Sequence, residues 1–155
     1  MPFTNSNDYL AGRTPVVYPS GPEVVAVRFA IDMVSADLDA NDIGVVGILP
    51  AGCIPVALYY DSDDLDANAT PTIVASVGIL TTAETALSTA TADGGAVWGS
   101  GIATSQAGGQ SAVVSRALSR VQKASGDRKI GILFSAAAAT KAAGQVGLTL
   151  LYRAA

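Results

Sequence analysis

The densest group of side chains able to bind a cation or a proton is the segment 61–66, where four aspartates occur within six residues. Hard cations such as Ca²⁺ prefer several oxygen ligands from one loop, so a calcium site is one interpretation. The spacing departs from an EF-hand loop, because no central glycine is present and the twelfth position counted from Asp61 is Thr72. The alternative, which the sequence favours, is a solvated turn whose Asp side chains accept hydrogen bonds from local backbone N–H groups.

The chain lacks the side chains that the common catalytic sites need. The chain contains no histidine, which removes the commonest general base, the Ser-His and Cys-His nucleophiles and most catalytic zinc sites. The single cysteine, Cys53, lies in the apolar run 51–55 without a neighbouring base, so we expect a small buried side chain and not a reactive thiol. A glycosidase-like carboxylate pair would need stacking aromatics, which are few. We therefore expect no enzymatic activity, no catalytic residue, no metal and no cofactor.

Two glycine pairs invite a phosphate-loop interpretation, but neither fits one. Gly94-Gly95 and Gly108-Gly109 do not match the GxxxxGK[ST] pattern, and neither lies between a strand and a helix start. Turn glycines are the favoured interpretation. The lone Trp98 is either a core residue or an interface anchor, and its sequence context does not separate the two.

The basic residues of the chain gather in one zone but do not predict nucleic-acid binding. This zone comprises Arg116, Arg120, Lys123, Arg128 and Lys129. Interleaved aromatic residues are missing, and the formal net charge of the whole chain is −4. A solvated face or a set of salt-bridge partners is favoured, and we expect no nucleic-acid partner.

Charge is sparse and unevenly distributed. Charged residues make up only 14% of the chain, so Ala, Gly, Ser and Thr must cover much of the surface, and such a surface docks on another protein with little desolvation of charge. Residues 1–78 hold ten acids and two bases, whereas residues 79–155 hold three acids and seven bases. The two halves either neutralise each other within one folded domain or form an acidic and a basic face suited to head-to-tail contact.

The elements that must position these side chains are short strands separated by turns. The run 24–33 is β-branched and partly alternating, which is typical of a strand with one buried face. Further strands are expected over 43–49, 54–60, 72–80, 97–104, 130–134 and 146–152. Thr81 and Glu84 have capping-box spacing, which predicts a short helix over 81–91. The segment 111–123 fits either a helix or a strand, and its neighbourhood favours a strand.

These elements predict an all-β fold, a jelly-roll-like antiparallel sandwich with one short helix and an extended N-terminal arm. Residues 1–22 are polar and rich in Gly and Pro, so we expect an arm there and a single sandwich domain over 23–155. A disordered terminus is one interpretation of the arm, and its apolar residues make docking on a neighbour a second one. No signal peptide and no membrane-spanning segment are expected, which predicts synthesis in the cytoplasm and no membrane partner.

Several short motifs, taken in order, resemble those of structural proteins from tailed bacteriophage heads. They extend over about residues 42–152 and include Ile48-Leu49-Pro50-Ala51-Gly52, Asp63-Asp64-Leu65-Asp66, Val77-Gly78-Ile79-Leu80, Ser105-Gln106-Ala107-Gly108-Gly109, Arg128-Lys129-Ile130-Gly131-Ile132 and Ala143-Gly144-Gln145-Val146. Each motif alone is weak, and their order and spacing carry the resemblance.

The resemblance implies a capsid cement or decoration protein, a small domain on the outside of the shell that bridges capsomers. Its partners would be the major capsid protein and further copies of itself, as a homo-oligomer on the capsid exterior of the virion. Two other classes stay open on sequence alone: a phage tail or baseplate component, and a calcium-dependent binding sandwich module.

Overall fold

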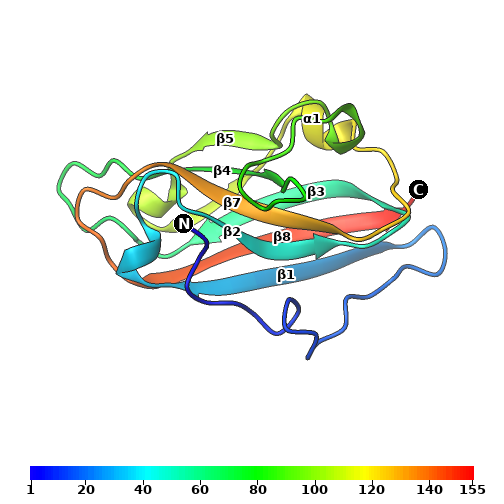
Figure 1. Ribbon diagram of the computed structural model, residues 1–155, viewed down its shortest axis with the longest axis horizontal. Helices are drawn as coiled ribbons and strands as arrows, with labels where there is room; N and C mark the ends of the chain where they lie inside the picture. The colour runs from blue at the N-terminus through cyan, green and yellow to red at the C-terminus, as the bar shows by residue number, and fades with distance from the viewer.

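A computed structural model describes all residues 1–155 as a sandwich of two four-stranded antiparallel sheets (Figure 1). The strands are β1 (Val24–Met33), β2 (Ile43–Leu49), β3 (Cys53–Ser62), β4 (Val74–Ile79), β5 (Gly99–Ile102), β6 (Gly109–Ala112), β7 (Arg128–Ala136) and β8 (Gly144–Ala154). The helical elements are the single turn α1 (Arg116–Ser119) and the 3-10 turns η1 (Ser35–Asp37), η2 (Thr91–Asp93) and η3 (Thr104–Gln106). No helix is long and apolar enough to span a membrane.

The strand order is that of a jelly roll. Sheet A has the order β1-β8-β3-β6 and sheet B the order β2-β7-β4-β5, so most connections cross from one sheet to the other. The strands run along the long axis of the molecule (Figure 1). The loops therefore lie at the two ends of the sandwich, and the charged side chains that they carry lie there too. The predicted all-β sandwich is confirmed.

Alternation along β1 shows why these residues form a two-layer fold. Val27, Phe29, Ile31 and Met33 are buried, while residues between them face outward. Inward-facing side chains of both sheets form one core of 28 buried residues, whose largest members are Trp98, Tyr60, Tyr152, Phe29 and Phe134. Trp98 is fully buried, which settles its role as a core residue.

One polar network lies inside this core. The Tyr60 hydroxyl and the Ser105 hydroxyl share a hydrogen bond of 2.7 Å, and Ser105 donates to Ser62 over 2.9 Å. Burial raises the pKa of Tyr60 to about 12, although the two serine hydroxyls act in the opposite direction. Because Ser105 belongs to η3 and the other two residues to β3, the network fixes the β5–β6 connection to sheet A.

The predicted helix over 81–91 is wrong. Residues 81–87 form a tight loop closed by the Thr81 N–H to Ala86 carbonyl hydrogen bond, and Glu84 has a left-handed φ of 58°. The Thr81 hydroxyl has no hydrogen-bond partner, so the capping box does not form. The loop is favoured because Leu80 and Leu87 pair across it and pack with Ile43 on the outer face of sheet B.

The segment 111–123 contains both of the alternatives that its sequence allows. Strand β6 ends at Ala112, and α1 follows after Ser115, whose hydroxyl accepts a hydrogen bond from the Leu118 N–H at 3.1 Å. The preference for a strand is therefore wrong for residues 116–119. A local cap outweighed the β-branched composition, because Ala117 and Leu118 bury themselves against the core in the helical turn.

Candidate interaction surfaces

Residues 1–22 contain no regular secondary structure and lie along their own domain, beside the edge strands β1 and β2 (Figure 1). The Met1 amine forms an ion pair with Asp42 at 2.9 Å, and the Met1 carbonyl accepts a hydrogen bond from the Ile43 N–H at 3.0 Å. Further along, the Asn7 side-chain amide donates to the Val46 carbonyl at 2.8 Å. These contacts occupy part of the exposed edge of β2, which would otherwise offer unpaired backbone groups.

Aromatic side chains anchor this segment. The Phe3 ring packs on Phe134 with ring centroids 5.8 Å apart, and Tyr9 meets Phe29 edge to face at 4.9 Å. Position 44 must be glycine for this contact, because a Cβ there would lie 2.2 Å from the Phe3 ring. The segment therefore docks on the chain's own core instead of hanging free.

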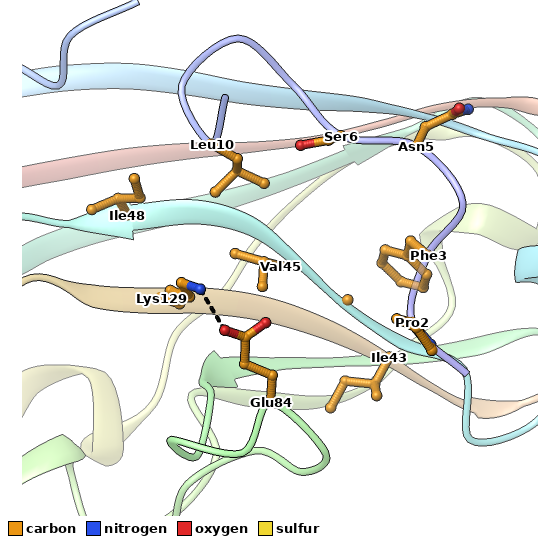
Figure 2. A pocket seen from close by; sticks show the side chains of 11 residues that line it. Pro2, Phe3, Asn5, Ser6, Leu10, Ile43, Val45, Ile48, Glu84 and Lys129 are labelled. Carbon is orange, nitrogen blue, oxygen red and sulfur yellow. Dashed lines mark hydrogen bonds and ion pairs between the residues drawn. The ribbon is translucent and has the colours of Figure 1, made fainter. Parts of the chain in front are cut away.

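A groove of about 320 Å³ lies between this segment and the 81–87 loop (Figure 2). Its floor is the outward face of β2, with Ile43, Val45 and Ile48, and Leu10 lines the side formed by the N-terminal segment. Glu84 on the opposite wall pairs with Lys129. These are the only ionisable side chains in the lining, so the groove suits an apolar side chain of a partner better than any reaction chemistry.

The outer face of sheet A carries an uncovered apolar region, which we call the sheet A patch. Its members are Val24, Val56, Tyr59 and Val114, and they are between 37% and 88% exposed. The register brings β3 and β6 together here, since Tyr59 pairs with Ala112 and the Val113 N–H donates to the Leu58 carbonyl. Exposed apolar side chains gathered on one sheet face mark an interaction surface.

Charge is separated between the two ends of the sandwich. The loops 34–42, 63–73 and 137–143 lie at the end we call the acidic end; they contain Asp37, Asp39, Asp42, Asp63, Asp64, Asp66 and one base, Lys141. At the opposite, basic end, Arg116, Arg120, Lys123 and Arg153 are exposed and form no ion pair, whereas Arg128 and Lys129 pair with Asp93 and Glu84. The fold thus combines the two interpretations of the charge asymmetry: Glu84, Asp93 and Asp127 also lie at the basic end and neutralise part of its charge, while the overall balance differs between the two ends.

The acidic segment 61–66 ties the fold together through its carboxylates. Asp66 is buried and accepts four backbone N–H hydrogen bonds, from Thr72, Ile73, Ala139 and Thr140, over 2.7–3.2 Å. Burial opposes ionisation of this carboxyl, but the four donors together outweigh it and lower its pKa to about 2. The carboxylates of this segment accept backbone N–H hydrogen bonds, as predicted, but the expected solvation is wrong for Asp66, which is buried and joins two loops outside the segment.

The neighbouring aspartates are also engaged by the protein itself. Asp64 accepts the Asp66 N–H at 3.0 Å, Asp63 accepts the Gln145 N–H at 2.8 Å, and Asp61 pairs with Arg28. No group of three or more His, Cys, Asp or Glu side chains is placed to hold a metal ion.

The remaining residues singled out from the sequence have structural positions. Cys53 is buried, and burial first and the nearby Asp127 charge second raise the pKa of its thiol. All four residues of the two glycine pairs have positive φ, between 76° and 127°, which confirms them as turn glycines.

Arg128 is the residue whose role the sequence does not reveal. Instead of facing solvent with the other bases, it is half-buried, bonds to Asp93 at 3.1 Å and donates to the Gln122 carbonyl at 2.8 Å. It therefore joins the β4–β5 connection to the start of β7. The sequence around Arg128 shows no hydrophobic periodicity that would predict a half-buried arginine joining two segments.

Comparison with known proteins gives the same class. No protein-family model and no curated protein sequence matches the chain. A chain in the structure of the capsid of Ralstonia phage GP4 has the same fold with a TM-score of 0.79 and 31% sequence identity, and the match covers 97% of each chain. A chain of the cyanophage Pam1 capsid asymmetric unit shares the fold with a TM-score of 0.58 and 24% identity, over 91% of this chain and 94% of that one. The chain therefore belongs to a family of phage capsid proteins and is a structural component of the virion.

Proposed function

We propose that this chain is a cement, or decoration, protein that binds the outside of an assembled phage capsid and stabilises contacts between capsomers. The observation that carries the proposal is the self-contained fold. The core closes within one chain, and the N-terminal segment packs on that same core through Phe3, Tyr9 and Val16. A subunit that folds without a partner suits addition to a shell that has already assembled.

The stabilising effect follows from differential binding. A ligand that binds assembled shell better than free subunits stabilises the shell by RT ln(1 + [L]/Kd). Repetition by the symmetry of the shell turns many modest contacts into high avidity. The low proportion of charged residues favours such contacts, because little charge is desolvated on docking. The major capsid protein is the proposed partner, and the chain needs no catalytic group for this role.

Residues 1–22 are proposed as an arm that is separate in role from the sandwich domain 23–155. On the shell, the arm leaves its own domain and extends along a neighbouring subunit. Its release would break the Met1–Asp42 ion pair and the Phe3 and Tyr9 ring contacts, so new contacts on the neighbour must replace them. Release would remove the N-terminal wall of the groove of Figure 2 and uncover the β2 edge, which suits strand addition by a segment of the capsid partner.

The experiment is co-sedimentation of the purified chain with its cognate capsids. Saturable binding at a fixed ratio to capsid subunits supports the cement role. An antibody is too large to enter the shell, so labelling of the bound chain by an antibody would support a position on the exterior. No binding to expanded shells, together with a defined ring formed by the chain alone, would instead support a tail or baseplate component.

The arm is tested in the same assay with three proteins. Removal of residues 1–22 deletes it, and Phe3→Ala loosens it within a full-length chain. Gly126→Ala is the matched control, because a Cβ at that exposed position meets no atom within 4 Å. If the arm binds a neighbour, the truncated chain loses affinity while Phe3→Ala and the control retain it. Equal binding by all three chains would rule out a role for the arm.

A further inference from the structure

We propose that copies of this chain associate head to tail, with the basic end of one copy seated on the acidic end of the next. The inference rests on the proposed function for its setting, since a decorated shell holds many copies side by side. It adds which surfaces meet and which charges recognise each other.

The basic end presents its cations on a fixed support. Arg116 and Arg120 lie on and directly after the α1 turn, which is held by the Ser115 cap and by burial of Ala117 and Leu118. Neither arginine forms an ion pair within its own chain. An arginine on a rigid turn loses little freedom on binding and offers a planar donor fork that matches carboxylates.

Apolar surface adjoins these cations. Val114 lies two residues before α1 and is 88% exposed, and Val56 on the neighbouring strand β3 is 48% exposed. Arg153 on β8 pairs in register with Ile54 of β3 and with Val24 of β1, so a further cation lies within the sheet A patch. Apolar side chains with unpaired cations beside them favour a partner that contributes carboxylates.

The acidic end of the same molecule offers those carboxylates in an open recess. Asp32, Asp61 and Asp63 line it, with Arg28 as its only cation. Arg28 pairs with Asp61, whereas Asp32 and Asp63 bond to Gln145, so two carboxylates are left without a cationic partner. A guanidinium from a second copy entering this recess would form charge-assisted, bidentate hydrogen bonds.

The position of the two surfaces favours a second copy as the occupant. The α1 cations and the recess lie at opposite ends of strands that span the molecule, so Arg116 and Arg120 of one copy cannot reach the recess of the same copy (Figure 1). Each copy carries both halves of the contact. A contact between two different surfaces is heterologous and produces a closed ring or a row, and both suit repeated positions on a shell.

Charge reversal at each end tests the contact. The first variant carries Arg116→Glu, Arg120→Glu and Lys123→Glu, and the second carries Asp32→Lys and Asp63→Lys. The control is Gly126→Ala, which leaves every charge in place at an exposed position where a Cβ meets no atom within 4 Å. Thermal unfolding first establishes that each variant folds, and Asp32→Asn with Asp63→Asn replaces the second variant if its lysines disturb Gln145.

Sedimentation velocity then reports association. Wild type and the Gly126→Ala control should self-associate at low salt. Their association constant should fall at least about tenfold by 0.5 M salt, where the Debye length is about 4 Å. Each reversed variant alone should be monomeric, whereas an equimolar mixture of the two should form a one-to-one species. A mixture that stays monomeric, or wild-type association insensitive to salt, would overturn the proposal.

Co-sedimentation of the same variants with capsids separates this proposal from the cement role. If the chain binds capsids but neither wild type nor any variant self-associates, the head-to-tail contact is refuted and the cement role stands. Salt-sensitive self-association with no capsid binding refutes the cement role and leaves the head-to-tail contact supported.

Discussion

The Phe3 ring occupies the space that a side chain at position 44 would fill, since a Cβ built on Gly44 would lie 2.2 Å from it. This relationship joins the N-terminal arm to the edge strand β2 and makes arm docking depend on a single glycine. Behind it, Phe3 rests on Phe134 of the core. The docked arm is thus part of the folded protein and not a loose tail.

Gly44→Ala should therefore expel Phe3 and release the arm. Overpacking at such a site destabilises a protein by about 1–3 kcal/mol. Limited proteolysis within residues 1–22 should accelerate, and the midpoint of thermal unfolding should fall. Gly126→Ala, in open space at a conventional φ, serves as control and should change neither measurement. Unchanged proteolysis in Gly44→Ala would show that the arm does not depend on this contact.

Asp66→Asn should destabilise the chain strongly. The Oδ2 atom accepts from Thr72, Ile73 and Ala139, and Oδ1 accepts from Thr140. An amide with its oxygen in the Oδ2 place turns its NH2 group towards the Thr140 N–H, which loses its acceptor, and the other three donors lose a charged partner. A buried donor left unsatisfied costs about 1–3 kcal/mol, so we expect a loss of about 2–3 kcal/mol in the free energy of unfolding. Asp64→Asn, at an exposed carboxylate with one hydrogen bond, should cost under about 1 kcal/mol. Denaturant titration distinguishes the two, and equal losses would contradict this role of Asp66.

The lowered pKa of Asp66 predicts acid sensitivity. Its carboxyl titrates at about 2 in the folded chain against 3.8 ordinarily, so the folded state favours the ionised form. That contribution to stability is complete above about pH 4 and is lost as the pH falls towards 2. Denaturant midpoints measured between pH 5 and pH 2 should fall for wild type and converge on those of Asp66→Asn. A constant gap between the two proteins across this range would refute the assignment.

Much of the fold could be predicted because its strands have strong local patterns. The alternation of 24–33 and the apolar run 43–49 predict β1 and β2 with the observed bounds. The helix predicted over 81–91 is wrong because a capping box between Thr81 and Glu84 contributes less free energy than burial of Leu80 and Leu87. These two leucines contact each other only in the folded chain. Tertiary packing overrides a weak local signal of this kind.

The interaction surfaces were less predictable, because they depend on which loops meet. The charge asymmetry of the two halves was visible in the sequence, but only the strand directions place Asp63 and Arg116 at opposite ends of the sandwich. Docking of the arm on its own domain depends on the fit between Phe3 and Gly44, which are 41 residues apart and share no motif.

The most direct test of the cement role is the temperature at which capsids release their DNA, with the chain present and after its removal. The account predicts that shells lacking the chain release DNA at a lower temperature, and that adding back purified chain restores the original value at a saturating ratio to capsid subunits. An unchanged release temperature, despite stoichiometric binding of the chain, would contradict it.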